Sequence, residues 1–219
     1  MMEKAEVLRR IEELSVVPVV RAPSAATALA AVEALLEGGI SVFEITLTVP
    51  GALGVIESLV ARFGDRAIVG AGTVLSAASA ESAVAAGAAF VVSPGLDLKT
   101  VERMRARNIA IFPGALTPTE ILTAWNAGAD IVKIFPCSAL GGAKYITQLR
   151  GPLPDIKLMP TGGVSLGTAV EYLRAGATAV GLGTDLVDIQ AVESGRAHVL
   201  TERTRALFET LKPARTTLA

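Results

Sequence analysis

Short apolar runs alternate with longer alanine- and leucine-rich segments along the whole chain. We predict a β-strand from each apolar run, and each intervening segment is long enough for one helix. The eight predicted strands cover residues 16–22, 42–48, 67–74, 90–95, 109–115, 131–138, 156–164 and 179–186. Eight strand–helix units of roughly 20–30 residues predict an α/β fold, a (β/α)8 or TIM barrel, and fit the alternative of a doubly wound sheet less well.

Recurring residues mark the expected helix ends. Glycine stands where a helix C-cap precedes the next strand, at 38–39, 87, 128 and 176. The candidate N-caps are Ser24, Ser76, Asp97, Thr117 and Ser165, and Pro118 fits a first helical turn. An extra N-terminal helix is predicted over Lys4–Leu14, where it would close the bottom of the barrel, and the last helix over about 193–211.

Composition supports one domain and an oligomer. The 219 residues show no break in composition, so we predict a single barrel domain over 1–219. A hydrophobic share of 51% with only 19% charged residues indicates more apolar surface than a monomer leaves exposed. The net charge of −1 and the lack of a basic block argue against a nucleic-acid partner.

Other features of the sequence indicate where in the cell the protein is located and which cofactors it could bind. Gly, Pro or charge interrupts every apolar stretch before about 18 residues, and residues 1–10 are charged and unlike a signal peptide. We therefore expect a cytoplasmic protein with no membrane partner. Cys137 has no disulfide partner in the chain, and we expect it to be a small buried hydrophobe. Since His198 is the only histidine, a multi-histidine metal site is excluded, and we expect no metal and no cofactor.

Lys133 is the one charge in the apolar run 131–136. Such runs are typical of strands buried on both faces, and an ammonium buried without a partner tends to lose its proton. Desolvated lysines are the groups that form Schiff bases with carbonyl substrates, so Lys133 indicates carbon–carbon bond chemistry. The structural alternative is a strand-end lysine whose head reaches water.

Glu44 is the candidate partner of Lys133. Residues 43–49 alternate in polarity, and Glu44, Thr46 and Thr48 share the parity that we expect to face the barrel interior. A carboxylate there is costly unless it handles protons or pairs with a cation. A purely structural Glu44–Lys133 ion pair is the alternative.

Two further strand ends carry candidate binding residues. Arg21 ends the first strand, and its planar guanidinium suits a substrate carboxylate, although a surface arginine at the rim has the same pattern. Thr73 directly follows the run Gly70–Ala71–Gly72. At this strand end its hydroxyl can bind an oxygen or cap a helix.

Glycines at the ends of the last two strands favour a phosphate site. Gly162 and Gly163 follow the seventh strand, and Gly183 precedes Thr184 after the eighth. In barrels of this kind these loops bind phosphate through backbone N–H groups and a helix N-terminus.

The chain resembles the 2-keto-3-deoxy-6-phosphogluconate/4-hydroxy-2-oxoglutarate aldolase family of class I aldolases over nearly its whole length. The most specific stretches are 43–46, 70–74, 93–95, 133–136 and 160–163. The resemblance implies that Lys133 forms the Schiff base and Glu44 is the general acid/base. It also implies substrate contacts at Thr48, Thr73, Pro94, Phe135 and Thr161, and phosphate contacts at Gly162, Gly163, Gly183 and Thr184.

One position departs from part of the family. Some members carry an arginine where this chain has Thr48, and members with Thr there have an arginine ending strand one, so Arg21 is the expected replacement. The resemblance further implies a homotrimer that needs no cofactor. Its implied substrates are a phosphorylated 2-keto-3-deoxy sugar acid and pyruvate.

The implied reaction is cleavage of 2-keto-3-deoxy-6-phosphogluconate to pyruvate and glyceraldehyde 3-phosphate, with 4-hydroxy-2-oxoglutarate as a second substrate. A close alternative is the 6-phosphogalactonate epimer, with selection by side chains near Thr46, Thr48 and Thr161. A phosphosugar isomerase or epimerase would use Glu44 as a base without a covalent adduct. A non-catalytic trimeric scaffold is the third alternative, and the retained Glu44–Lys133 pair argues against it.

Overall fold

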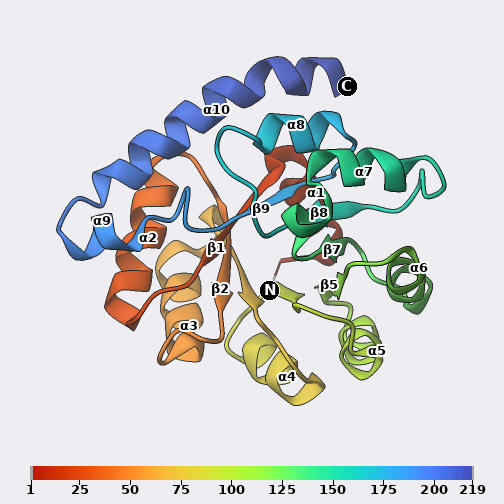
Figure 1. The fold of residues 1–219 in the computed structure, drawn as a ribbon. Coiled ribbons are helices and arrows are strands. Elements are labelled where there is room, and N and C mark those ends of the chain that lie inside the picture. The colour runs from red at the N-terminus through yellow and green to blue at the C-terminus, as the bar shows by residue number, and fades with distance from the viewer. Residues whose placement is uncertain (1, 219) are drawn as a thin grey trace.

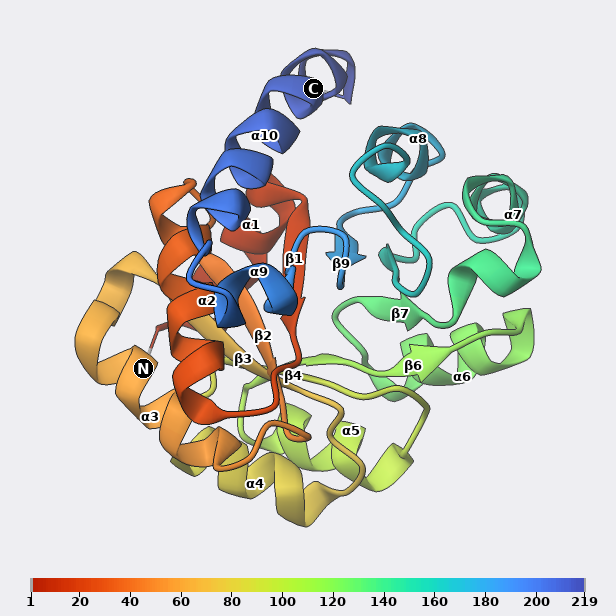
Figure 2. The same ribbon diagram turned by 60° about the vertical axis from the view of Figure 1, so that its left-hand side comes forward.

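Parallel strands curl around a common interior, and helices cover the outside of the sheet (Figures 1 and 2). The structure is a computed structural model that describes residues 2–218, with side chains described to residue 211. The strands are β1 (Val16–Val20), β2 (Val42–Thr46), β3 (Ile68–Gly72), β4 (Phe90–Val92), β5 (Ala110–Phe112), β6 (Gly114–Ala115), β7 (Val132–Ile134), β8 (Leu158–Pro160) and β9 (Val180–Leu182). The helices are α1 (Lys4–Leu14), α2 (Ala25–Glu37), α3 (Ala52–Phe63), η1 (Gly64–Arg66), α4 (Ala77–Ala85), α5 (Leu98–Ala106), α6 (Pro118–Ala127), η2 (Cys137–Leu140), α7 (Ala143–Arg150), α8 (Ala169–Arg174), α9 (Ile189–Glu193) and α10 (His198–Leu218).

The strands pair in chain order. One sheet has the order β5-β4-β3-β2-β1-β9 and the other the order β6-β7-β8. The two sheets meet at two seams: Pro113 alone separates β5 from β6, and Thr161 beyond β8 forms a parallel bridge with Gly181 in β9. Because β1 to β5 and β6 to β8 pair in sequence order and β9 pairs with β1, the strand order is not that of a doubly wound sheet.

The predicted strands are all present, but each is shorter than predicted. The fifth, predicted over 109–115, is divided at Pro113, which has no N–H to donate to a ladder. The sixth was predicted to reach 138, but it ends at Ile134, and the short helix η2 begins at Cys137. Several candidate binding residues lie just beyond these shortened strands: Arg21, Thr48, Thr73, Phe135 and Thr161.

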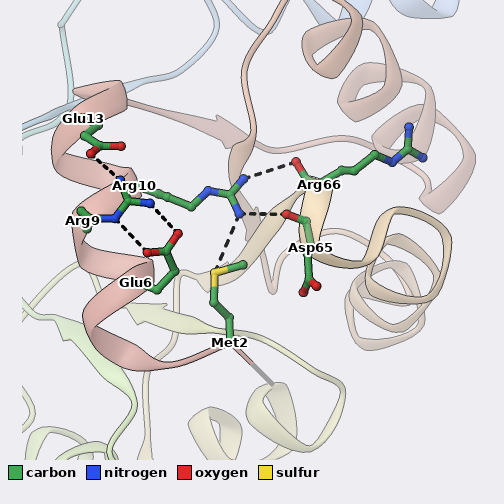
Figure 3. A network of polar contacts seen from close by, with 7 residues as sticks. All are labelled: Met2, Glu6, Arg9, Arg10, Glu13, Asp65 and Arg66. Atoms are coloured by element: carbon green, nitrogen blue, oxygen red, sulfur yellow. Dashed lines mark hydrogen bonds and ion pairs between the residues drawn. The ribbon is translucent and has the colours of Figure 1, made fainter.

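Helix α1 lies against one end of the strands. Val7 and Ile11 are fully buried and join a cluster with inward-facing strand residues that include Val42, Phe90 and Phe112. The rings of Phe90 and Phe112 stack with centroids 5.4 Å apart. On the outer side of α1, Arg10 donates to the carbonyls of residues 65 and 66 in η1, while Arg9 pairs with acidic residues of its own helix (Figure 3).

Most helix ends follow the predicted chemistry. Ser24, Ser76, Asp97 and Thr117 each accept a hydrogen bond from the backbone N–H three residues later. Glycines 39, 87, 128 and 176, which follow α2, α4, α6 and α8, have φ values of 106°, 101°, 98° and 99°, which glycine adopts without strain.

Two helix predictions are wrong in their bounds. Ser165 does not begin α8; it forms a turn with Thr168, and the helix starts at Ala169. The last helix, predicted over about 193–211, is α10, which begins later, at His198, and ends at Leu218; Glu193 already ends the separate helix α9, and Gly195 at φ 74° lies between the two. Among residues 2–218, no helix is both long and apolar enough to cross a membrane.

Candidate active site

Lys133 and Glu44 face each other on the inner side of the curled sheets. Lys133 lies in β7 and Glu44 in β2, and their side chains are 6% and 1% exposed. The alternative that Lys133 reaches water is therefore wrong. Lys133 Nζ lies 3.8 Å from Glu44 Oε1, which is longer than a hydrogen bond. This separation argues against a tight structural ion pair and leaves the amine free of a direct bond to the carboxylate.

Glu44 is held in an unusual environment. Neither carboxylate oxygen accepts a hydrogen bond from the described residues. Burial raises the pKa of the Glu44 carboxyl, and the charges of Lys133 and then Arg21 act in the opposite direction. The side chain crosses Gly72 of β3 so closely that a Cβ there would lie 1.9 Å from Oε1. A carboxyl whose pKa is raised toward neutrality suits proton transfer.

Arg21 joins three strand ends. It follows β1, and its guanidinium donates to Thr48 Oγ1 at 3.2 Å and to Thr73 Oγ1 at 3.4 Å. Thr73 has a left-handed backbone, with φ 55°, a conformation that occurs often at functional sites. Thr46 Oγ1 lies 2.9 Å from Thr48 Oγ1 and also donates to the carbonyl of Val20. The sequence-predicted carboxylate-binding residues therefore lie together.

The ring of Phe135 contacts Lys133 and also lines a pocket. Lys133 Nζ lies 5.3 Å from the centroid of the Phe135 ring, a distance that favours a cation–π contact. The same ring lies close to Gly162, where a Cβ would be only 3.1 Å from it. The ring thus lies between the lysine and the glycine loop.

The pocket of about 460 Å³ contains both predicted glycine loops. Its lining comprises Val19, Phe135, Thr161, Gly162, Gly163, Val164, Ser165, Gly183, Thr184 and Asp185. Gly162 and Gly163 have φ values of 84° and 79°. The expected helix N-terminus is not part of this arrangement, because α8 is short and begins only at Ala169.

Some residues fall outside the expected set. Pro94 lies in the turn after β4, packed under Gly114, and is not among the residues lining the pocket. Val19, Val164, Ser165 and Asp185 line the pocket and were not predicted. Asp185 directly follows Thr184, so the sequence did contain a signal: a carboxylate next to the predicted phosphate-binding residues.

A buried lysine and carboxylate at the carboxyl ends of a curled parallel sheet are typical of the aldolase class of carbon–carbon lyases. The sequence model described as KDPG and KHG aldolase matches residues 7–202, and the chain belongs to this aldolase family. KDPG and KHG here denote 2-keto-3-deoxy-6-phosphogluconate and 4-hydroxy-2-oxoglutarate. The family resemblance noted in the sequence is thereby confirmed.

Individual relatives agree with this membership. The chain is 37% identical to a 2-dehydro-3-deoxy-phosphogluconate aldolase of Pseudoalteromonas atlantica over 85% of this chain and 86% of that protein. It is 35% identical to the 2-dehydro-3-deoxy-6-phosphogalactonate aldolase of Escherichia coli over 80% and 85%. A crystal structure of KDPG aldolase from Legionella pneumophila, with pyruvate captured as a covalent carbinolamine, aligns with a TM-score of 0.85 at 32% identity, covering 91% and 97%. The chain is therefore an aldolase, and the isomerase and scaffold alternatives lose their support.

Proposed function

We propose that this protein is a class I aldolase that cleaves 2-keto-3-deoxy-6-phosphogluconate to pyruvate and glyceraldehyde 3-phosphate through an imine on Lys133. The observation that carries the proposal is the buried Lys133–Glu44 pair at 3.8 Å, with neither oxygen of Glu44 hydrogen-bonded to any of the described residues. Such a pair supplies a nucleophile and a proton-transfer group within reach of one substrate.

The covalent chemistry needs only these two side chains. The neutral amine of Lys133 attacks the C2 ketone, and loss of water gives a protonated imine that accepts electrons from the neighbouring bond. Glu44 then takes the proton of the C4 hydroxyl, and the C3–C4 bond breaks to release the aldehyde. The electron pair of that bond forms the pyruvate enamine. Glu44 returns a proton to C3, and hydrolysis frees pyruvate and the lysine.

The remaining site residues position the substrate. Arg21, fixed by Thr48 and Thr73, is oriented to bind the C1 carboxylate through charge-assisted hydrogen bonds. The glycine loops of the pocket are assigned to the phosphate end, with backbone N–H groups at Gly162, Gly163, Gly183 and Thr184 as donors. Thr161, Phe135 and Pro94 are assigned to contacts along the substrate between these two ends.

The C4 configuration of the substrate is a separate question. A galactonate-type relative is nearly as similar as the gluconate-type one, and Thr46 and Thr48 form a hydrogen-bonded hydroxyl pair near Arg21. We expect a higher kcat/KM for the gluconate epimer, and cleavage rates measured on both epimers test this. 4-Hydroxy-2-oxoglutarate is the expected second substrate.

The proposal also covers the closure of the barrel, the oligomeric state and the cellular location. We infer that residues 1–219 form one closed (β/α)8 barrel domain with α1 as its extra N-terminal helix, supported by the contacts at both seams between the sheets. A homotrimer is supported by Leu53 and Leu75, which are 38% and 71% exposed, and sedimentation analysis tests it. The cytoplasmic location stays a prediction that cell fractionation can test.

Turnover of two variants tests the assigned roles. Lys133→Ala should lose essentially all cleavage, whereas Lys144→Ala, which removes an exposed lysine of α7, should not. Glu44→Gln should still form the imine and cleave about 10²–10⁴-fold more slowly, since it cannot transfer the proton. Near-native cleavage by Lys133→Ala would contradict the imine mechanism, and unaffected cleavage by Glu44→Gln would remove Glu44 from proton transfer.

A further inference from the structure

A chain of hydroxyl groups connects Arg21 to the backbone of the strand that precedes it. Arg21 Nη1 donates to Thr48 Oγ1 at 3.2 Å, and Thr48 Oγ1 lies 2.9 Å from Thr46 Oγ1. Thr46 Oγ1 in turn donates to the carbonyl of Val20 at 3.1 Å. Val20 ends β1 and Thr46 ends β2, which lies beside β1 in the sheet (Figure 2). The chain therefore begins at the guanidinium and ends on the residue before it.

The direction of each hydrogen bond in this chain is fixed by its two ends. A guanidinium only donates and a carbonyl only accepts, whereas a hydroxyl has one hydrogen to donate and can also accept. Since Thr46 gives its hydrogen to Val20, Thr48 must donate to Thr46 and keeps its lone pairs for Arg21. Hydrogen bonds aligned in one direction polarise and strengthen one another. Loss of the Thr46 hydroxyl would release Thr48 from the orientation that accepts from Arg21.

Thr46 is the buried member of the chain. It is fully buried, whereas Thr48 and Arg21 are exposed. Of the two hydroxyl partners of Arg21, Thr48 is the closer, because the 3.4 Å contact with Thr73 exceeds the usual N–H···O length. The backbone around Thr48 is held separately, since the N–H groups of the residues on either side donate to the carbonyls of Gly72 and Thr46. The hydroxyl of Thr46 therefore orients the side chain of Thr48 and not its backbone.

We propose that Thr46 is a positioning residue that acts through Thr48 to hold the guanidinium of Arg21 where it receives the substrate carboxylate, and so favours 2-oxo acids over uncharged ketones. The inference rests on the proposed aldolase function, in which Arg21 binds that carboxylate and Lys133 attacks the neighbouring ketone. The effect of Thr46 should therefore appear in the binding of a ketone that carries a carboxylate and not in the reactivity of Lys133.

The first experiment compares pyruvate with acetone, in which a methyl group replaces the carboxylate. The imine on Lys133 is trapped with cyanoborohydride, and the apparent second-order rate constant of trapping is measured for each ketone by intact-protein mass spectrometry. Thr46→Val keeps the shape of the side chain and removes the hydroxyl. We expect this variant to trap pyruvate about 3–10-fold more slowly, as for one lost hydrogen bond, and to trap acetone within about twofold of the unaltered protein.

Two further variants separate positioning from packing. Thr46→Ser keeps a hydroxyl at the same place and should trap pyruvate within about twofold of the unaltered protein. Thr201→Val is the matched control, because Thr201 is also buried and its hydroxyl donates to a backbone carbonyl, that of Ala34, at 2.9 Å, but it lies in α10. Thr201→Val should leave both trapping rates unchanged, and thermal melts check that each variant is folded.

A double variant tests whether Thr46 acts through Arg21. In Arg21→Gln the guanidinium is already absent, so the additional change Thr46→Val should slow pyruvate trapping by less than about twofold. An effect of Thr46 that is independent of Arg21 would instead multiply the losses of the two single variants.

The outcomes separate this inference from the proposed function. Equal losses for pyruvate and acetone in Thr46→Val, an unchanged rate with pyruvate, or multiplied losses in the double variant would overturn the inference and leave the imine mechanism intact. An unaltered, folded protein that traps neither ketone would contradict the proposed function, and the inference would fall with it.

Discussion

Replacement of Gly72 by alanine should displace Glu44 without removing any group that reacts. Gly72 lies at the end of β3, and a Cβ there would lie 1.9 Å from Glu44 Oε1, 2.4 Å from Cδ and 2.5 Å from Cγ. Real Cβ atoms essentially never approach another heavy atom closer than 3.0 Å. The carboxylate of Glu44 must therefore move by at least 3.0 − 1.9 = 1.1 Å, since β3 is held in the sheet by pairing on both sides.

This displacement sets the expected magnitude. A misplacement of about 1 Å costs on the order of 10²-fold in rate when a catalytic group must meet a bound substrate. Overpacking of a filled interior costs about 1–3 kcal/mol of stability. Gly72→Ala should therefore fold with a lower melting temperature and cleave on the order of 100-fold more slowly.

Single-turnover kinetics separate this effect from damage to Lys133. We expect the Gly72→Ala variant to form a borohydride-reducible pyruvate adduct, because Lys133 is not touched, while kcat for cleavage falls. Gly151→Ala is the matched control, since a Cβ at Gly151 makes only an ordinary contact at 3.7 Å. A folded Gly72→Ala protein with near-native kcat would refute the placement of Glu44 in proton transfer.

Three further results are expected. Burial raises the pKa of Glu44 above its ordinary value of 4.5, so the folded state holds the proton more tightly than the unfolded chain does. The free energy of unfolding contributed by this group therefore falls as the pH rises above 4.5. Over that pH range Glu44→Gln should gain stability relative to the unaltered protein, as measured by thermal melts. Arg21→Gln should raise KM about 10–100-fold through loss of charge-assisted bonds to the substrate carboxylate, measured by steady-state cleavage; an unchanged KM would remove Arg21 from that role. Thr117→Ala should lower the free energy of unfolding by about 1 kcal/mol, since Thr117 caps α6 through the N–H of Glu120, and no loss in urea unfolding would contradict the capping assignment.

The central pair was predictable because its sequence signal is local. Lys133 breaks an apolar run, and Glu44 has the parity of the interior face of β2, so the sequence alone indicated that both are buried on the inner side of the sheet. The fold class followed from the regular alternation of strands and helices. The division of the fifth strand could also have been expected, because Pro113 lacks the N–H that a ladder requires.

Other features depend on contacts that no local pattern reveals. Gly72 gives space to the side chain of Glu44, a contact between two strands that the local sequence does not indicate. The ring of Phe135 lies over Lys133 because the chain turns after β7, and its position beside Gly162 joins two loops far apart in sequence. Asp185 was visible as a residue after Thr184, yet only the fold shows that it enters the pocket and bonds to Leu166.

The most direct test of the imine on Lys133 is reduction with borohydride in the presence of pyruvate, followed by intact-protein mass spectrometry and peptide mapping. We expect one reduced pyruvate per chain, located on Lys133, in the unaltered protein and in Lys144→Ala. No adduct should form on Lys133→Ala. A folded protein that acquires no adduct, or acquires it at a lysine other than Lys133, would contradict the proposed mechanism.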